Sequence, residues 1–200
     1  KNNSIQRWDG FKVPWPFYRT FDKNDDRLSV LVGEYMGNDG VLFNEESDII
    51  KHGNTYSGAV PVKYGEDPES TGDGSQIDWI VYRYADVLTL LSEAIVRQGN
   101  SVTQEAVDLL NQIRVRAKLS PYTMGDIKGV DDFLDKMLQE RGHEFWWEGN
   151  RRADLIRHGK FIQNAIDRGS TTTNPEFVLF PLPQAVINEG KGIIIQNPGY

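Results

Sequence analysis

The sequence predicts a mainly α-helical protein in which a helical scaffold carries a loop-rich, irregular segment. Between residues 84 and 145 apolar residues recur at spacings of three and four, which is typical of helices that bury one face. Residues 1–80, in contrast, hold nine of the nineteen glycines, four prolines and only short apolar runs. We therefore expect a loop-rich segment over residues 1–80, packed on a helical domain over residues 81–200.

Residues 1–80 predict loops, turns and a few short strands or single helical turns. Their apolar runs, LSVLV, GVLF and AVPVKY, are too short to predict regular helices. The run GEDPESTGDGSQ, residues 65–76, holds almost no apolar residue and many turn formers, so we expect a mobile surface loop there.

Two amphipathic helices are expected over residues 84–117. Gly99 and Asn100 should end the first helix, because both tolerate the left-handed conformation found just past a helix end. Ser101 and Gln104 match a capping box that would open the second helix. Two helices joined by a turn over about 34 residues are typical of one TPR unit, which needs neighbouring repeats to bury both faces. The apolar positions of the pair are Tyr84, Val87, Leu88, Leu91, Ala94, Ile95, Ala106, Leu110, Ile113 and Ala117.

The rest of the chain predicts further helices joined by polar links. A third helix is expected over residues 132–147, with Asp131 or Asp132 as its cap. Asn150 is placed to cap a fourth helix, RRADLIRHGKFIQNAIDRG. The stretch FVLFPLP should be extended, because the residue before a proline is pushed out of the helical region. Pro183 is well placed to begin a last short helix.

Composition and charge exclude several classes of function. The net charge is −7 and the pI about 5.0, which argues against a nucleic-acid partner because phosphate contacts need clustered lysine and arginine. The chain has no cysteine and therefore no disulfide, thiol nucleophile or cysteine metal ligand. No apolar run approaches the roughly 18–20 residues that a membrane-spanning helix needs.

Three glutamates, Glu140, Glu144 and Glu148, fall four residues apart on one face of the third helix. A pair of carboxylates is the minimum equipment of a glycoside hydrolase, so hydrolysis is one alternative function. The favoured interpretation is an ion-pair network with nearby arginines, since such networks are common on helices. No catalytic residue is therefore assigned, and the expected partners of the glutamates are Arg141, Arg151 and Arg152.

No metal or cofactor is expected. Asp22, Asn24 and Asp26 have the spacing that begins a calcium loop, but Arg27 and Gly33 stand where the glycine and the bidentate glutamate of that loop should be. A turn in which these side chains bond their own backbone is the favoured interpretation. The three histidines are scattered, with no two at ligand spacing on one helix.

Aromatic residues provide the candidate binding site. Six of them crowd into residues 8–21, where no periodicity assigns them to a core. Such rings suit sugars, because the apolar face of a pyranose stacks on an aromatic ring while polar neighbours bond its hydroxyls. The candidate glycan-binding residues are Trp8, Trp15 and Tyr18. The alternative is that these rings only fasten the segment to another part of the protein.

Four motifs occur in an order that resembles one protein family: RYADVL with SEA, LNQIRVRA, ERGHEFWWEGNRRADLIR, and FPLPQAVINEG with the final NPGY. Together they resemble the C-terminal half of the SusD/RagB family, nutrient-binding lipoproteins of the Bacteroidetes outer membrane. The resemblance is close over residues 82–200 and looser over residues 17–63. It implies a TPR-containing helical fold whose companion repeats and lipid-bearing cysteine lie upstream.

The resemblance also implies a function. A SusD-like protein would bind an oligosaccharide or other polymeric nutrient without cleaving it, at the surface of the outer membrane, and deliver it to a SusC-like TonB-dependent transporter. Contacts to the glycan vary within the family, so no binding residue is carried over by motif. The runner-up is a TPR-type interaction scaffold that binds only protein, and a glycoside hydrolase is the second alternative.

Overall fold

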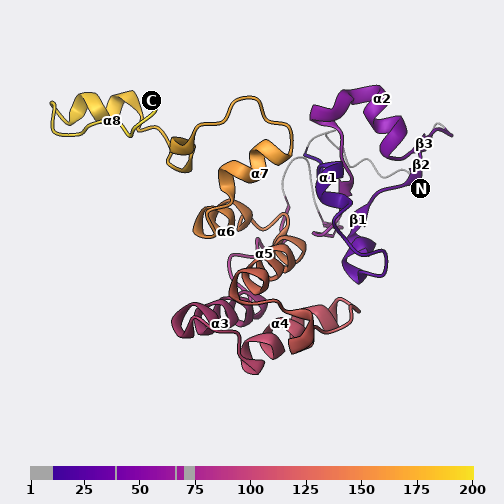
Figure 1. Cartoon of the computed structure of the whole chain (residues 1–200). Helices are drawn as coiled ribbons and strands as arrows, with labels where there is room; N and C mark the ends of the chain where they lie inside the picture. The colour runs from indigo at the N-terminus through magenta and orange to yellow at the C-terminus, as the bar shows by residue number, and fades with distance from the viewer. Residues whose placement is uncertain (1–10, 39, 66, 70–74) are drawn as a thin grey trace. The chain divides into compact units, whose positions relative to one another are not determined.

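A computed structural model describes residues 11–38, 40–65, 67–69 and 75–200, and it is mainly helical, as the sequence predicts (Figure 1). The chain forms two compact units, Lys1–Gly149 and Asn150–Tyr200. The boundary that composition suggests at residue 80 therefore does not coincide with the boundary between these units. None of the described helices is long and apolar enough to cross a membrane.

The loop-rich part of the first unit contains two small antiparallel strand pairs. In one pair Leu31 faces Pro61, and in the other Tyr35 faces Phe43. The short elements of this part are α1 (Trp15–Tyr18), η1 (Asp26–Val30), β1 (Leu31–Val32), β2 (Tyr35–Met36), β3 (Leu42–Phe43), α2 (Glu45–Tyr56) and β4 (Val60–Pro61). Short strands and a single helical turn agree with the sequence-based expectation.

Helix α2 was not expected, because its sequence, EESDIIKHGNTY, lacks a continuous apolar face. Its start follows from capping: the Asn44 side chain accepts a hydrogen bond from the Ser47 amide, and the Ser47 hydroxyl accepts one from the Asn44 amide. Gly53 interrupts the helical conformation with φ of 71°. The capping pair was visible in the sequence, and it predicts this helix better than apolar periodicity does.

The helical scaffold of the first unit consists of α3 (Tyr84–Gly99), α4 (Gln104–Arg116) and α5 (Val130–Phe145). Asn100 ends α3 in the left-handed conformation, with φ of 45°, as expected. The cap of α4 is Thr103, whose side chain accepts from the Ala106 amide at 3.2 Å, so the assignment of Ser101 was wrong. Both residues carry a hydroxyl, and the turn places only Thr103 at the free amides.

Helix α5 begins two residues earlier than predicted, at Val130. The position before it is Gly129, with φ of 135°, and no side chain caps the helix. Asp132 does not cap the helix either, because its Oδ2 accepts from the Lys128 amide in the preceding turn. The predicted capping role of Asp131 or Asp132 was therefore wrong, although both lie in the first turn, where negative charge is favourable.

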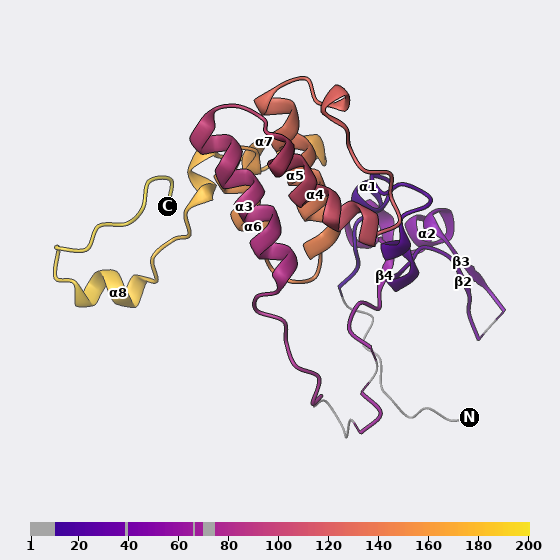
Figure 2. The ribbon, with the colours of Figure 1, turned by 90° about the horizontal axis from the view of Figure 1, so that it is seen from below.

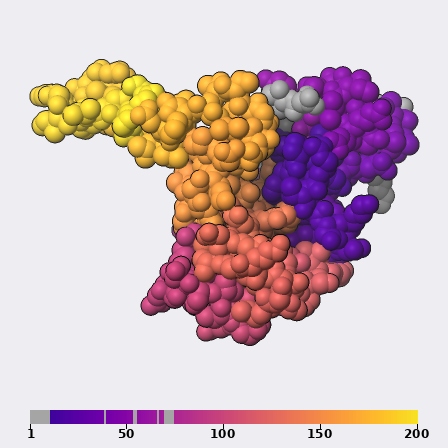
Figure 3. Space-filling view, in the orientation of Figure 1, coloured from indigo at the N-terminus to yellow at the C-terminus, as the bar shows by residue number. Residues whose placement is uncertain are grey.

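Two apolar clusters form the core of the first unit. One lies between α3, α4 and α5, and its buried members are Val96, Ala106, Val107, Leu110, Phe133, Leu134 and Met137. The other gathers residues of the loop-rich part around α1 and β1, and its buried members are Val13, Trp15, Phe21, Leu31, Ala59 and Trp146. In Figure 3 the indigo surface of the loop-rich part lies against the red-orange surface of the helical scaffold. One hydrogen bond between these parts runs from the Asp26 amide to the Ala117 carbonyl, at 3.0 Å.

The tryptophan pair after α5 does not lie on the helix, which ends at Phe145. Trp146 has an extended backbone, and Trp147 has φ of 68°. Trp146 is buried in the second cluster, and the Trp147 ring meets the edge of Phe11 at a centroid distance of 6.2 Å. Trp146 is thus the core residue of the pair, but the expectation that the helix continues to Trp147 was wrong.

The second unit contains α6 (Arg151–Arg157), α7 (Phe161–Asp167), η3 (Pro175–Val178) and α8 (Gln184–Glu189). The single fourth helix that the sequence predicted is two helices, because Gly159 takes φ of 66° between them. Asn150 makes no capping hydrogen bond. Phe177 and Val178 belong to a 3-10 turn that Asn174 caps, not to an extended segment. Pro183 directly precedes α8, as predicted.

Candidate functional site

The structure describes two of the three aromatic residues proposed from the sequence. Trp15 is 2 % exposed and packs edge-on against Tyr18 at 5.4 Å between ring centroids. A buried indole offers no open face to a sugar, so the expectation for Trp15 is corrected. Tyr18 is half-buried over Gly33, and its role stays a prediction. Trp8 lies outside the described residues.

Asp48 on α2 explains why Trp15 is buried. Its Oδ2 accepts from the Trp15 indole at 3.1 Å and from the Gly58 amide at 2.7 Å. Its Oδ1 accepts from Lys12 Nζ at 2.7 Å and lies 2.8 Å from His52 Nδ1. Burial raises the pKa of Asp48, but these hydrogen bonds outweigh that effect and lower it overall. For Trp15 the structure thus favours the alternative in which the ring fastens the segment.

The three glutamates are buried counter-ions. Glu140 and Glu144 lie on α5, whereas Glu148 lies in the turn after it, so the expectation that all three share one helix face was wrong for Glu148. Each carboxylate faces at least two cations that come from other parts of the first unit, and two cations, Arg27 and Arg83, each pair with two of the glutamates. The pairs are Glu140 with Arg27 and Arg114, Glu144 with Arg27, Arg83 and Arg116, and Glu148 with Lys63 and Arg83. An ion-pair network was predicted correctly, but its partners were not.

One predicted partner of the glutamates, Arg141, contacts residues of α3. Arg141 binds Asp86 at 2.7 Å and the hydroxyl of Thr89. Arg151 and Arg152 belong to the second unit. Sequence spacing identified the nearest arginines, whereas the structure uses residues as far away as Arg27, which lies 117 positions before its partner glutamate.

This geometry contradicts a glycosidase pair on α5. The general acid of a glycosidase needs a raised pKa, so that it holds a proton at neutral pH. Burial raises the pKa of Glu144, but the hydrogen bond and charge of Arg83, with the charges of Arg116 and Arg27, lower it overall. The carboxylate is thus held ionised by cations. Among the described residues, no group of three or more His, Asp or Glu side chains is placed to hold a metal ion.

The acidic turn near residue 24 has the local structure that the sequence favoured. The Asn24 amide donates to Asp22 Oδ1 at 2.8 Å, which closes an Asx turn. The neighbouring Asp26 pairs with Lys118 at 2.6 Å. These contacts use the carboxylates within the protein and account for their spacing without a calcium ion.

Glu148 joins the two ends of the loop that connects β4 to α3, a long connection in Figure 2. Lys63 and Arg83, which flank residues 64–82, both pair with its carboxylate. Lys63 Nζ also donates to the Glu144 carbonyl at 2.8 Å, and Arg83 Nη2 donates to the same carbonyl at 2.8 Å. Burial lowers the pKa of Lys63 and outweighs the opposing effect of Glu148. The base of the loop is therefore fixed on the end of α5.

Two aromatic rings stack across this loop. Tyr64 and Trp79 lie 5.1 Å apart between centroids, with their planes only 12° from parallel. Trp79 is 61 % exposed, whereas Tyr64 is half-buried. We call this pair the Trp79 platform. Asp78 and Gln76, which are exposed, lie next to it in sequence and carry polar groups. The sequence-based reasoning missed Trp79; its signal was a tryptophan in the polar stretch SQIDW, outside any apolar periodicity.

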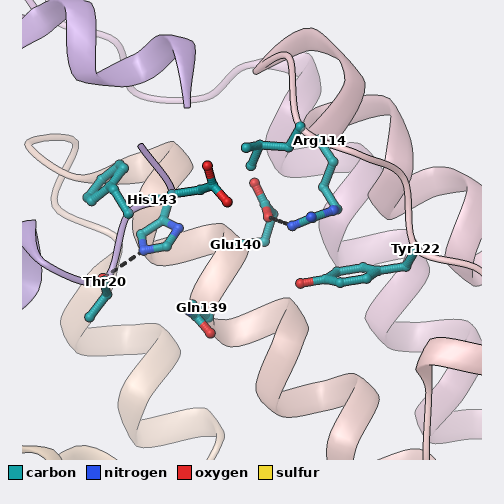
Figure 4. Close-up of a pocket in the computed structure, with 9 residues that line it drawn as sticks. Thr20, Arg114, Tyr122, Gln139, Glu140 and His143 are labelled. Atoms are coloured by element: carbon teal, nitrogen blue, oxygen red, sulfur yellow. Dashed lines mark hydrogen bonds and ion pairs between the residues drawn. The ribbon is translucent and has the colours of Figure 1, made fainter. Parts of the chain in front are cut away.

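A second feature is a pocket of about 260 Å³ on the scaffold (Figure 4). It lies where the turn after α1, the end of α4 with the loop that follows it, and the C-terminal half of α5 meet. Its lining residues are Thr20, Phe21, Asp22, Arg114, Leu119, Tyr122, Gln139, Glu140 and His143. In Figure 4, Arg114 bonds Glu140 on one side, and His143 bonds Thr20 on the other.

The wall of the pocket that carries Tyr122 is held by α4. Asn111 makes two hydrogen bonds to the backbone of Tyr122, of 2.7 and 2.8 Å. Arg114 stacks on the Tyr122 ring at 3.8 Å and donates to the Ser120 carbonyl at 3.0 Å. Burial raises the pKa of Tyr122, so its hydroxyl keeps its proton at neutral pH. The pocket is therefore bounded by fixed groups, which favours a defined ligand pose.

Comparison with known proteins agrees with this fold. The family model described as SusD family matches residues 12–200. The starch-binding protein SusD of Bacteroides thetaiotaomicron is 27 % identical over 165 residues, which cover 79 % of this chain and 27 % of that protein. SusD-like protein P38 of Formosa agariphila is 38 % identical over 90 residues, which cover 42 % of this chain and 18 % of that protein. The chain thus spans about a quarter or less of these relatives.

Two solved structures have a similar fold. A SusD superfamily protein from Parabacteroides distasonis superposes with a TM-score of 0.70 at 24 % sequence identity, covering 93 % of this chain and 41 % of that one. A SusD homologue from Bacteroides thetaiotaomicron gives 0.71 at 20 % identity, covering 94 % and 44 %. These structures share its fold, and the family match extends over nearly the whole chain. The chain belongs to the SusD family.

Proposed function

We propose that this chain is part of a surface protein of the outer membrane that binds an oligosaccharide without cleaving it and passes it to a SusC-like TonB-dependent transporter. Family membership supports the proposal, as does the name of the B. thetaiotaomicron relative, a starch-binding protein. The absence of cleavage is proposed because Glu140, Glu144 and Glu148 are engaged as counter-ions.

The observation that carries the proposal is the Trp79 platform. An exposed indole can stack on the apolar face of a sugar ring, and Tyr64 supports its other face at a nearly parallel angle. A ring held in place loses little conformational freedom when a ligand binds, which increases affinity. The ion pairs of Lys63 and Arg83 with Glu148 hold the two sides of the loop together beneath the platform.

The affinity at such a platform should be modest. One open ring buries little of the sugar, and each sugar hydroxyl that leaves water must be hydrogen-bonded again. We expect dissociation constants in the micromolar to millimolar range, roughly −8 to −4 kcal/mol. Several sugar residues in contact with the same loop would account for a preference for oligosaccharides over monosaccharides at this platform.

The test is calorimetric titration of the protein with a panel of oligosaccharides, including α- and β-linked glucans. Trp79→Ala should weaken binding by about tenfold or more, which corresponds to about 1.4 kcal/mol. Trp79→Phe should retain part of the affinity, because a smaller ring still stacks. Tyr56→Ala is the matched control, since Tyr56 is an exposed aromatic residue on α2. Equal affinities for Trp79→Ala and the unaltered protein would exclude the platform as the site.

One observation favours the runner-up, a scaffold that binds only protein. Tyr84, Val87 and Leu91 on α3 are exposed, and their spacing places them on one helix face. An exposed apolar stripe of this kind suits contact with another helix. If no oligosaccharide binds to the folded protein, and Val87→Asp and Leu91→Asp abolish capture of a TonB-dependent transporter, the scaffold function is supported instead.

A further inference from the structure

We propose that the pocket between α4 and α5 is a second ligand site, one that takes a single neutral sugar ring. It uses none of the residues of the Trp79 platform. The two sites therefore make separate predictions: the platform would contact a chain of sugars, whereas the pocket would enclose one ring.

The size of the pocket limits its ligand. Pockets for drug-sized molecules usually measure about 300–1,000 Å³. The volume here, about 260 Å³, lies just below that range and equals the space of roughly nine liquid waters at about 30 Å³ each. That space suits one six-membered ring with its hydroxyls, but not an extended oligosaccharide. Thr20, Asp22 and Gln139 are exposed, so the pocket is open to solvent on their side.

The polar groups of the pocket match a polyhydroxylated ligand. Within the described part of the chain, the Tyr122 hydroxyl, the Gln139 amide and Asp22 Oδ2 have no hydrogen-bond partner, so each can bind a ligand. Together they offer a hydroxyl that donates, an amide that both donates and accepts, and a carboxylate oxygen that accepts. Sugar hydroxyls both donate and accept, so they can satisfy all three.

Apolar groups complete the match. Phe21 lines the pocket and stacks on the His143 ring at 4.0 Å, with 29° between their planes. Leu119 lines it as well. Phe21 is buried, so the C–H face of a sugar ring would lie against Leu119, which is half-buried, while its hydroxyls face the polar groups. A purely polar ion such as phosphate would leave these apolar groups unused.

The charges of the pocket select a neutral ring. The residues that line the pocket include one arginine, Arg114, and no lysine. The Arg114 guanidinium already binds Glu140 at 2.9 Å and the Ser120 carbonyl at 3.0 Å. Asp22 adds a carboxylate on the open side. A ligand with its own carboxylate would meet this negative charge without a spare cation to bind it. Uronic acids should therefore bind more weakly than the corresponding neutral sugars.

The experiment measures binding of methyl glycosides of glucose, galactose and mannose to the protein, by saturation-transfer NMR and calorimetry at millimolar concentrations. Glucuronate serves as the charged comparison. We expect binding of at least one neutral methyl glycoside, weakened about threefold to tenfold by Tyr122→Phe and by Gln139→Ala, as expected for the loss of one hydrogen bond. Both variants keep the packing of the wall, because Phe retains the ring and Gln139 is exposed.

Trp79→Ala separates this proposal from the proposed function. Monosaccharide binding should be unchanged in Trp79→Ala, and oligosaccharide binding at the platform should be unchanged in Gln139→Ala. The pocket proposal is overturned if no neutral methyl glycoside binds, if glucuronate binds as well as the neutral sugars, or if both pocket variants bind with unaltered affinity. Loss of monosaccharide binding in Trp79→Ala would assign that binding to the platform, which also overturns the proposal.

Discussion

Replacement of Asp48 by alanine should destabilise the first unit more than any change on the surface of α2. The carboxylate is 1 % exposed and accepts from the Trp15 indole and the Gly58 amide. Its removal leaves both donors buried without a partner, at about 1–3 kcal/mol each, and also leaves Lys12 without its carboxylate. Loss of one partner of a buried charge pair costs about 3–5 kcal/mol, and we expect a loss in that range.

The assay is urea unfolding at pH 7, followed by tryptophan fluorescence. Trp15 and Trp146 lie in the same buried cluster, so their emission reports on that part of the unit. Asp48→Asn should lose less stability than Asp48→Ala, because its one oxygen can still accept from Trp15 and Gly58. Lys51→Ala is the control on α2, since Lys51 is exposed, and it should change the free energy of unfolding by less than about 0.5 kcal/mol.

The dependence on pH gives a second check. The pKa of Asp48 is lower in the folded protein than its usual value of 3.8, so its ionised form stabilises the fold. That contribution is complete above the unfolded pKa and is lost as the pH falls through the folded pKa. The difference in stability between the unaltered protein and Asp48→Ala should therefore shrink below about pH 4. If Asp48→Ala lowers the free energy of unfolding by less than about 1 kcal/mol at pH 7, the Trp15 indole and the Gly58 amide are not left as costly unpaired donors, and the prediction is refuted.

Three further predictions concern the scaffold. Glu144→Gln should lower the free energy of unfolding by about 3–5 kcal/mol in urea titrations, because it leaves the Arg83 charge partly unpaired. The pKa of Glu144 is lowered in the folded protein, so this loss should be larger at pH 7 than at pH 4, and a smaller loss at pH 7 would contradict the prediction. Glu148→Ala should speed proteolytic cleavage within residues 64–82 while far-UV circular dichroism keeps its helical signal, since the loop loses its anchor. Thr103→Ala should lower the free energy of unfolding by about 0.5–2 kcal/mol, whereas Ser101→Ala should change it little. Equal losses in the two variants would contradict Thr103 as the cap of α4.

The sequence predicted the helices that bury one apolar face, because a period near 3.6 is a local property of the chain. Helices α3 and α4 were placed almost to the residue for this reason. Helix α2 was missed because its polar sequence carries no such stripe and only its capping pair marks its start. The break at Gly159 was missed because one residue in a left-handed conformation hardly disturbs the pattern on either side.

The candidate site was predicted less well, because exposure depends on contacts between distant segments. Trp15 and Trp79 are both tryptophans near prolines, glycines or polar residues, and composition does not tell them apart. One is buried, where a carboxylate 33 positions away accepts a hydrogen bond from its indole N–H, and the other is exposed on a loop. The cations around Glu144 are likewise far apart in sequence, so their convergence appears only in the folded chain.

Glu148 anchors both ends of the loop between β4 and α3. Because Lys63 and Arg83 meet at one carboxylate, the residues between them begin and end at nearly the same place on the scaffold. Lengthening a loop whose ends are already joined costs little, about 0.6 kcal/mol for each doubling of its length. Insertions, deletions and exchanges within residues 64–82 can therefore be accommodated while α3, α4 and α5 stay as they are. The same property makes this segment a natural place to exchange sequences between homologues without disturbing the helices.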